Sequence, residues 1–310
     1  MRHYSMPISV VAVACGLLAG AATAHAGNET WVSATGSDTG TCPRTAPCRT
    51  FAFAHSQTTA NGAMNVLTSG NYGALTITKA ISVVADDVEA VINTAAGGAA
   101  IVVQAPAAAV ISLRGLTIDL RATANDGVLF SSGGTLHVQN CVIRRSVTGI
   151  NIQPSGNVEL HVADTVVADT AQTGIFVAPN GGDANALFER VRVENAGGSG
   201  IGFLGQNSAS ATTATVRDSV VSGNAGPGIS LFRLAGSVEV MVNRTVSANN
   251  DVGIDSQGTG AIVRIGNSTV TGNTAHGLNT GGSGTIASYG TNRIDGNVGN
   301  ETPTTTIATE

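Results

Sequence analysis

The chain has 310 residues, a net charge of −5 and 11% charged residues, well below the roughly 25% of an ordinary globular domain. A negative chain without a run of basic residues argues against nucleic acid as a partner. Forty glycines, together with abundant Val, Ile, Thr and Asn, favour many short strands joined by tight turns.

Residues 1–26 have the pattern of a signal peptide. Arg2 and His3 are basic, Ile8–Leu18 is apolar but too short to span a membrane, and Ala24–Ala26 (AHA) offers a cleavage site. We therefore expect an exported chain, periplasmic or extracellular, that begins near Gly27. No later stretch reaches the roughly 18 apolar residues of a membrane helix, so we expect no membrane span.

Residues 27–62 are predicted to cap the fold at its N-terminal end. Cys42 and Cys48 lie close together in CPRTAPC, and in an exported protein this spacing favours a disulfide between them. The segment Thr50–Thr58 (TFAFAHSQT) has the pattern of a short amphipathic helix. A helix here would cover the apolar end and the unpaired edge of the first strands that follow.

Residues 63–298 repeat with a period of about 25 residues, seen most clearly in VSGNAGPGIS (Val221–Ser230), VSANNDVGID (Val246–Asp255) and VTGNTAHGLN (Val270–Asn279). Apolar residues two positions apart follow each glycine, and this alternation is typical of strands. Such a period indicates units that bury their apolar faces by stacking on one another. We therefore predict an all-β, right-handed parallel β-helix of about eight to nine coils, stacked about 4.8 Å apart.

Alignment of the repeats gives four columns of core positions. The first core column contains Ile118, Ile143, Val167, Val193, Val221, Val246, Val270 and Ile294. The second contains Leu113, Val138, Val162, Phe188, Val216, Met241, Ile265 and Tyr289. The third contains Ile150, Ile175, Ile201, Ile229, Ile254 and Leu278, and its partner column contains Ile152, Val177, Phe203, Leu231, Ser256 and Thr280.

Two polar or small columns accompany them. Side-chain amides on successive coils can form a hydrogen-bonded ladder, which we predict for Asn224, Asn249, Asn273 and Asn297. A glycine column is expected where the backbone needs a conformation without Cβ, at Gly149, Gly174, Gly200, Gly228, Gly253 and Gly277. Cys141 is left unpaired, in a column of small packed side chains, and residues 299–310 are predicted to form a polar tail.

Four segments near the N-terminus resemble the start of secreted right-handed parallel β-helix proteins of the pectate-lyase-like superfamily. They are WVSATGSD (Trp31–Asp38), APCRTF (Ala46–Phe51), GNYGALTITKAISVV (Gly70–Val84) and LRGLTI (Leu113–Ile118). The resemblance covers nearly the whole mature chain and implies the fold. The superfamily includes polysaccharide lyases, glycoside hydrolases, epimerases, phage tailspikes and members without enzyme activity, so the fold alone does not name a reaction.

The resemblance raises the question of a calcium site, because calcium-dependent lyases of this superfamily place acidic ligands on neighbouring coils. A hard cation needs several converging oxygens. The column after the first core column contains Asp119, Arg144, Ala168, Glu194, Ser222, Ser247, Thr271 and Asp295, and a turn column contains Asn140, Asp164, Arg190, Asp218, Asn243 and Asn267. Neither places two acids on adjacent coils. We therefore expect no calcium, no other metal and no cofactor, but ion pairs such as Asp119 with Arg144 and Glu189 with Arg217.

The densest charge surrounds Glu189 and Arg190 and supplies the candidate catalytic residues Arg192, Glu194 and Arg217. An arginine held near carboxylates could neutralise or deprotonate a uronate. The alternative is a solvated patch of salt bridges without a catalytic role.

A second candidate site concerns ligand binding. Strand alternation places Phe176 and Phe232 on the outer face, with Leu204 on the coil next to Phe232 and Arg233 alongside. Exposed aromatic side chains on a regular β-face can stack on sugar rings or mark a protein contact. In the alternative arrangement, a loop from Ala178–Asn185 or Leu204–Thr212 covers them.

Two functions remain open at this point. The first is an exported protein that binds or processes polysaccharide, such as a cell-surface glycan, and that would be a polysaccharide lyase or glycoside hydrolase if it is an enzyme. The second is a non-enzymatic extracellular scaffold or adhesion module, which the missing acid column and the scarcity of aromatic residues favour. Converging acids and an arginine in one groove would distinguish the two.

Overall fold

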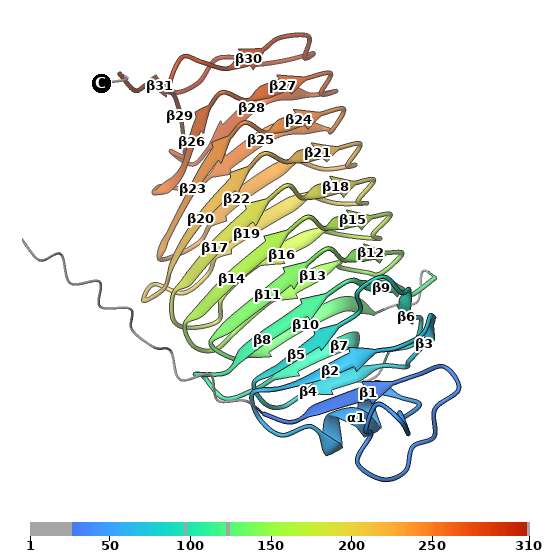
Figure 1. Ribbon diagram of the computed structural model, residues 1–310. Helices are drawn as coiled ribbons and strands as arrows, with labels where there is room; N and C mark the ends of the chain where they lie inside the picture. Colours follow the sequence, from blue (N-terminus) through green and yellow to red (C-terminus); the bar gives the residue numbers. More distant parts are fainter. Residues whose placement is uncertain (1–26, 96–97, 122–124, 309–310) are drawn as a thin grey trace, which may run out of the picture.

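The computed structural model describes residues 27–95, 98–121 and 125–308. It is an all-β, right-handed parallel β-helix of about eight turns, as predicted. The coils stack along one axis, from the helix α1 (Phe51–Gln57) at one end to β30 and β31 at the other (Figure 1). The predicted signal peptide, residues 1–26, lies outside the described residues. Among those residues, no helix is long and apolar enough to cross a membrane.

Three parallel sheets form the walls of the solenoid. Sheet A contains β1 (Glu29–Val32), β2 (Gly62–Val66), β5 (Ile81–Val84), β8 (Val110–Arg114), β11 (Thr135–Gln139), β14 (Val158–Ala163), β17 (Ala184–Glu189), β20 (Ala211–Arg217), β23 (Ser237–Asn243), β26 (Ala261–Gly266), β29 (Thr285–Ser288) and β31 (Thr305–Thr306). Sheet B contains β3 (Gly70–Asn71), β6 (Ala90–Ile92), β9 (Leu116–Asp119), β12 (Val142–Arg144), β15 (Val166–Ala168), β18 (Arg192–Glu194), β21 (Val220–Ser222), β24 (Val246–Ala248), β27 (Thr269–Thr271) and β30 (Arg293–Ile294). Sheet C contains β4 (Leu75–Ile77), β7 (Ala99–Gln104), β10 (Asp126–Ser132), β13 (Ile150–Ile152), β16 (Ile175–Val177), β19 (Ile201–Gly205), β22 (Ile229–Arg233), β25 (Val252–Gln257) and β28 (His276–Gly281).

The core lies between the sheets, where inward side chains stack on their register partners. The predicted third column is confirmed: its side chains pair in sequence from coil to coil and have no exposed area. Full burial of an isoleucine contributes about 1.5–3 kcal/mol relative to exposure. Because each coil buries its apolar face only against its neighbours, the stability of the solenoid depends on an uninterrupted stack.

The register corrects the first two core columns in two coils. Val246 pairs with Val220, and Ser247 is the inward residue between Val221 and Val270. The same slip replaces the predicted Met241 of the second column by Val242. A separate slip in the last coil replaces the predicted Tyr289 by Ser288, although Ile294 pairs with Val270 as predicted. Because alternate residues of a strand face opposite sides, a shift of one position moves a side chain to the other face. The buried hydroxyl of Ser247 donates to the carbonyl of Gly253 at 2.7 Å, so its polar group is satisfied.

The asparagine ladder is also shifted at this coil. Asn224 donates to Asn250 (2.8 Å), Asn250 to Asn273 (3.3 Å), and Asn273 to Asn297 (2.7 Å). The predicted Asn249 is wrong: it is exposed and has φ 56°, as Gly223 (69°) and Gly272 (66°) have on the neighbouring coils. Asparagine tolerates this left-handed conformation better than most residues. The turn from the ladder asparagine to the glycine is one residue shorter in this coil, which explains the error.

The predicted glycine column exists, but its cause is close stacking. A Cβ on Gly174 would lie 2.3 Å from Cγ1 of Val193 and 2.7 Å from the carbonyl oxygen of Gly200. A Cβ on Gly149 would meet the carbonyl oxygen of Gly174 at 2.5 Å. Neither glycine has a positive φ, so the next coil, and not the local backbone conformation, excludes a side chain here.

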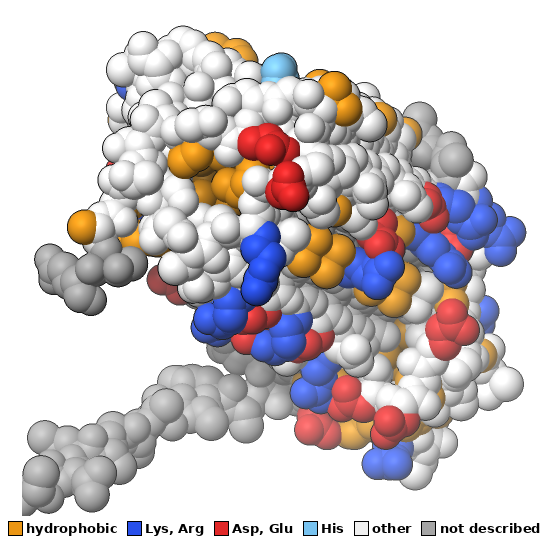
Figure 2. Space-filling view, turned by 90° about the horizontal axis from the view of Figure 1, so that it is seen from above, with side chains coloured by type: hydrophobic (Ala, Val, Ile, Leu, Met, Phe, Trp, Pro, Cys, Tyr) orange, Lys and Arg blue, Asp and Glu red, His pale blue; other side chains and the backbone are white. Residues whose placement is uncertain are grey.

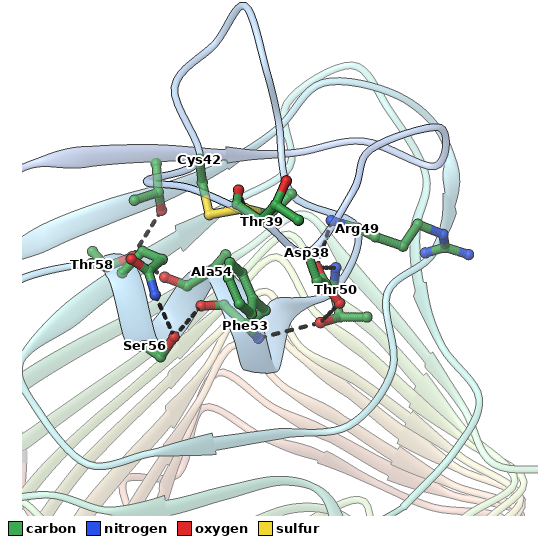
Figure 3. The surroundings of a disulfide bond; sticks show 12 residues. Asp38, Thr39, Cys42, Arg49, Thr50, Phe53, Ala54, Ser56 and Thr58 are labelled. Atoms are coloured by element: carbon green, nitrogen blue, oxygen red, sulfur yellow. Dashed lines mark hydrogen bonds between the residues drawn. A yellow bond between two sulfur atoms is a disulfide. The ribbon is translucent and has the colours of Figure 1, made fainter.

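The N-terminal end is capped as predicted by a disulfide and a helix. Cys42 and Cys48 form the disulfide, and both are fully buried beside α1 (Figure 3). The hydroxyl of Thr50 accepts from the backbone N–H of Phe53 at 3.2 Å, which satisfies one free donor of the first turn. Phe51 is buried against the first coils, so the helix covers apolar surface. Cys141 is a free, buried thiol in the column of small side chains.

The predicted polar tail folds back over the last coil. Thr305 and Thr306 form β31, which pairs with β29 at Ala287 and Ser288. The backbone N–H of Leu278 donates to the carbonyl of Asn300 at 2.9 Å. These contacts give β29 of sheet A and β28 of sheet C hydrogen-bonding partners.

Candidate functional site

The candidate catalytic residues lie at the corner between sheets A and B, in two separate ion pairs. Arg217, at the end of β20, contacts Glu189 at 2.8 Å, as predicted. Arg192 and Glu194, both on β18, contact each other at 2.5 Å. The structure therefore pairs Arg217 with Glu189 rather than with Glu194, and each of the two arginines already holds a carboxylate.

These pairs fix the protonation states at the corner. The hydrogen bond with Glu194 raises the pKa of Arg192, and the hydrogen bond from Arg217 lowers the pKa of Glu189. The guanidinium of Arg192 therefore stays cationic and the carboxylate of Glu189 stays anionic. A cationic arginine can neutralise a carboxylate, but it is not in the state that accepts a proton.

Similar ion pairs follow the turns between sheets A and B. Arg190 contacts Asp164 at 2.7 Å, and Arg244 contacts Asp218 at 2.7 Å. Arg244, rather than the predicted Asn243, occupies the left-handed position of this turn, with φ 48°. Figure 2 shows basic and acidic side chains next to one another along one side of the solenoid. This is a charge-matched ladder that joins coils.

The predicted pair of Asp119 and Arg144 is also present, at 3.0 Å, and Arg145 contacts the same carboxylate. The hydrogen bond from Arg145 lowers the pKa of Asp119, and the positive charge of Arg144 lowers it further. Within residues 27–95, 98–121 and 125–308, no three His, Cys, Asp or Glu side chains are grouped closely enough, as they stand, to hold a metal ion.

The predicted ligand-binding residues lie on the outer face of sheet C. Leu204 and Phe232 are register partners on β19 and β22, and Phe232 is 48% exposed. Phe176, on β16, is half-buried and packs beside Gly202. A Cβ on Gly202 would lie 3.3 Å from Cδ2 of the Phe176 ring, so glycine leaves room for the ring here. We call Phe176, Leu204 and Phe232 the aromatic patch. No covering loop hides Phe232 within the described part of the chain.

A polar row that the repeat alignment did not single out borders the aromatic patch. Gln257 is the register partner of Phe232 and donates to Asp255 at 2.6 Å, while Asn279 donates to the same carboxylate at 2.9 Å. Burial raises the pKa of Asp255 above its ordinary value, against the effect of these hydrogen bonds. Strand alternation from Ile254 could have placed Asp255 on this face. We call Asp255, Gln257 and Asn279 the polar row.

The side chain of Arg233 points away from the aromatic patch, toward the loops that connect sheets C and A. Its Nε donates to the carbonyl of Gly236, and the side chain lines a hollow of about 500 Å³. Asp183 and Leu234 line the same hollow, and Leu234 is 65% exposed. Arg233 is therefore ordered by its own turn and contributes to a surface next to, but distinct from, the aromatic patch.

A further hollow of about 330 Å³ lies on the outer face of sheet A, where the sequence analysis proposed no site. His137, Glu159, His161 and Leu187 line it. The two imidazole rings are edge to face, with centroids 5.8 Å apart. Burial lowers the pKa of His137, and the neighbouring His161 lowers it further. We call His137, Glu159 and His161 the histidine cluster.

The comparisons with known proteins agree with this architecture. No curated protein sequence matches the chain. Among solved structures, pectate lyase Pel9A is 12% identical, with a TM-score of 0.59 over 91% of this chain and 78% of that chain. The mannuronan C-5 epimerase AlgE4 A-module of Azotobacter vinelandii is 12% identical (TM-score 0.44, 80% of this chain and 91% of that chain). Pectin methylesterase PemA from Erwinia chrysanthemi is 14% identical (TM-score 0.48, 90% of this chain and 92% of that chain).

At this identity the likeness to pectate lyase Pel9A shows the fold alone, and the two lower TM-scores carry no argument. The family model for a right handed beta helix region matches residues 59–213 and 126–298. The two matches together cover every coil from β2 to β30. The chain therefore belongs to the right handed beta helix family.

Proposed function

We propose that this protein is exported and binds a polysaccharide on the outer face of sheet C. The observation that carries the proposal is the aromatic patch, in which the 48% exposed ring of Phe232 lies beside Leu204 and next to the polar row. A sugar ring offers apolar C–H faces and a rim of hydroxyl groups, so it suits an aromatic surface bordered by amides and a carboxylate. The buried disulfide supports export, because disulfides persist in oxidising compartments.

The fold supports the choice of ligand class. Pectate lyase Pel9A, named for its action on pectate, has the same architecture. Neighbouring strands lie about 4.8 Å apart, so the aromatic patch spans two inter-coil steps, or about 10 Å along the solenoid axis. A chain of sugars could therefore lie across several coils. At the corner of sheets A and B, Arg192 and Arg217 are already paired with carboxylates, which favours binding on sheet C over processing at that corner.

The test is retention of the mature chain on a panel of uronate-rich and neutral polysaccharides, with and without calcium. A Phe176→Ala, Phe232→Ala double variant should bind about tenfold or more weakly, because each aromatic contact contributes about 0.5–1.5 kcal/mol. The matched control is Val110→Ala, which removes a 50% exposed apolar side chain on sheet A. Equal binding by the double variant and wild type would contradict the proposal. New unsaturated or reducing ends would instead indicate processing, and an absence of both binding and products would favour the scaffold.

A further inference from the structure

The histidine cluster combines two imidazoles on neighbouring strands. His137 on β11 and His161 on β14 are register partners, and both point to the outer face of sheet A. Their ring centroids are 5.8 Å apart and their planes are inclined by 74°. Both rings line the same hollow of about 330 Å³.

One nitrogen of this pair lacks a partner. The Nε2 of His161 is buried and makes no hydrogen bond with any described residue. A buried polar atom without a partner costs about 1–3 kcal/mol, so such an atom usually has a ligand, an ion or a water as its partner. In the charged corner the Nε of Arg217 shares this feature, whereas the side chains of Arg192 and Glu194 bond each other.

A carboxylate stands beside the pair. Glu159 lies two residues before His161 on β14, on the same face, about 7 Å away along the strand. It lines the same hollow, and its side chain is exposed and forms no ion pair among the described residues. A metal site that includes this carboxylate requires its side chain to rotate toward the imidazoles.

We propose that His137 and His161 bind a divalent first-row transition ion such as Zn²⁺, with Glu159 as a third ligand after its side chain rotates. Zn–N bonds of 2.0–2.1 Å would place two imidazole centroids about 5–6 Å apart, close to the separation found here. Two imidazoles and one carboxylate suit Zn²⁺, Ni²⁺ or Cu²⁺ and not Ca²⁺, which prefers oxygen ligands alone. This site is independent of the proposed polysaccharide surface on sheet C.

Calorimetric titration of the mature chain, stripped with a chelator and without a histidine tag, tests the proposal. Zn²⁺ should bind at one ion per chain, and Ca²⁺ should not compete for the site. His137→Gln and His161→Gln should each weaken Zn²⁺ binding about tenfold or more, and Glu159→Gln should weaken it less. His276→Gln is the matched control, because His276 lies on sheet C, outside this hollow.

A second measurement covers the case in which a variant does not fold. Imidazole ¹⁵N spectra of the wild type should shift on addition of Zn²⁺ at His137 and His161, while His55 and His276 stay unchanged. The proposal would be overturned by a wild type that takes up no Zn²⁺, or by a His137→Gln, His161→Gln double variant that binds as tightly as wild type. Shifts confined to His276 would also overturn it.

Discussion

Two adjacent asparagines show how much one position matters in this fold. Asn250 is buried and bonds the amides of the coils on both sides, whereas Asn249 is exposed and provides a left-handed turn residue. Both residues are present in VSANND. Asn249 lies four residues before Gly253, the spacing found in the neighbouring coils, and was therefore predicted wrongly as the ladder residue. Hydrogen bonds decide which asparagine joins the ladder, because only the inward residue can reach both neighbours.

We predict that Asn250→Ala lowers the free energy of unfolding by about 1–3 kcal/mol, because it leaves the buried side-chain amide and the backbone N–H of Asn224 without an acceptor. Asn249→Gly should change the free energy by less than about 0.5 kcal/mol, because glycine adopts the same φ without strain. Urea unfolding of both variants measures the difference. A larger loss for Asn249→Gly would show that the ladder follows the spacing predicted from sequence.

A second residue-scale prediction concerns Asp255, whose pKa is raised by burial. A carboxyl with a raised pKa in the folded state binds its proton more tightly there than in the unfolded chain. Its contribution to stability is therefore complete below the ordinary pKa of 3.8 and is lost as the pH rises through the raised value. Asp255→Asn, which removes this charge, should raise the melting temperature at pH 7 and have little effect below pH 3.8.

Thermal unfolding of wild type and Asp255→Asn across this pH range checks the sign. Asp295→Asn, at a position for which no ion pair is present in the described structure, serves as the control for loss of one negative charge. If Asp255→Asn lowers the melting temperature at pH 7, the ionised carboxylate stabilises the polar row, and the raised pKa assigned to Asp255 is wrong.

At the scale of strands and turns, the close approach of successive coils explains the glycine column. The Cβ of an alanine at 174 would overlap the carbonyl oxygen of Gly200 and the side chain of Val193. The backbone must then move or the coils must separate. We predict that Gly174→Ala lowers the free energy of unfolding by about 1–3 kcal/mol, measured by urea unfolding.

Gly156 provides the matched control for this prediction. A Cβ at this turn position has no atom within 4 Å, and its φ is not positive. Gly156→Ala should therefore stay within about 0.5 kcal/mol of wild type. A similar loss in both variants would mean that general turn flexibility, and not contact between coils, selects glycine at 174.

The same scale shows what the sequence could and could not predict. Alternation and a period of about 25 residues were sufficient for the sheets, the inward columns and the ion pairs between coils, because these depend on register alone. Register failed where the segment between two inward residues changed length by one residue, near Val246 and again between Ser288 and Ile294. The histidine cluster could not be predicted from columns of like residues, because His137 and His161 form a column of only two residues. The polar row mixes a carboxylate with amides and forms no acidic column.

For the whole molecule, the solenoid behaves as a one-dimensional stack in which each coil contacts only its neighbours. Damage to one end should therefore spread from that end and leave distant coils intact. The N-terminal cap is the place to test this, because the disulfide of Cys42 and Cys48 and the helix α1 cover the first coil. The ion pairs along the coils are exposed on at least one side and contribute less to this end effect.

We predict that a Cys42→Ala, Cys48→Ala double variant loses about 2 kcal/mol of stability, because its short loop is no longer closed in the unfolded chain. Hydrogen exchange should show faster exchange in β1, β2 and α1, while β26 and β29 keep the protection of wild type. Reductant should reproduce this pattern in wild type and have no effect on the variant. A uniform loss of protection along the solenoid would mean that the coils unfold as one cooperative unit, and unchanged protection in β1 would mean that α1 alone is sufficient to cap the stack.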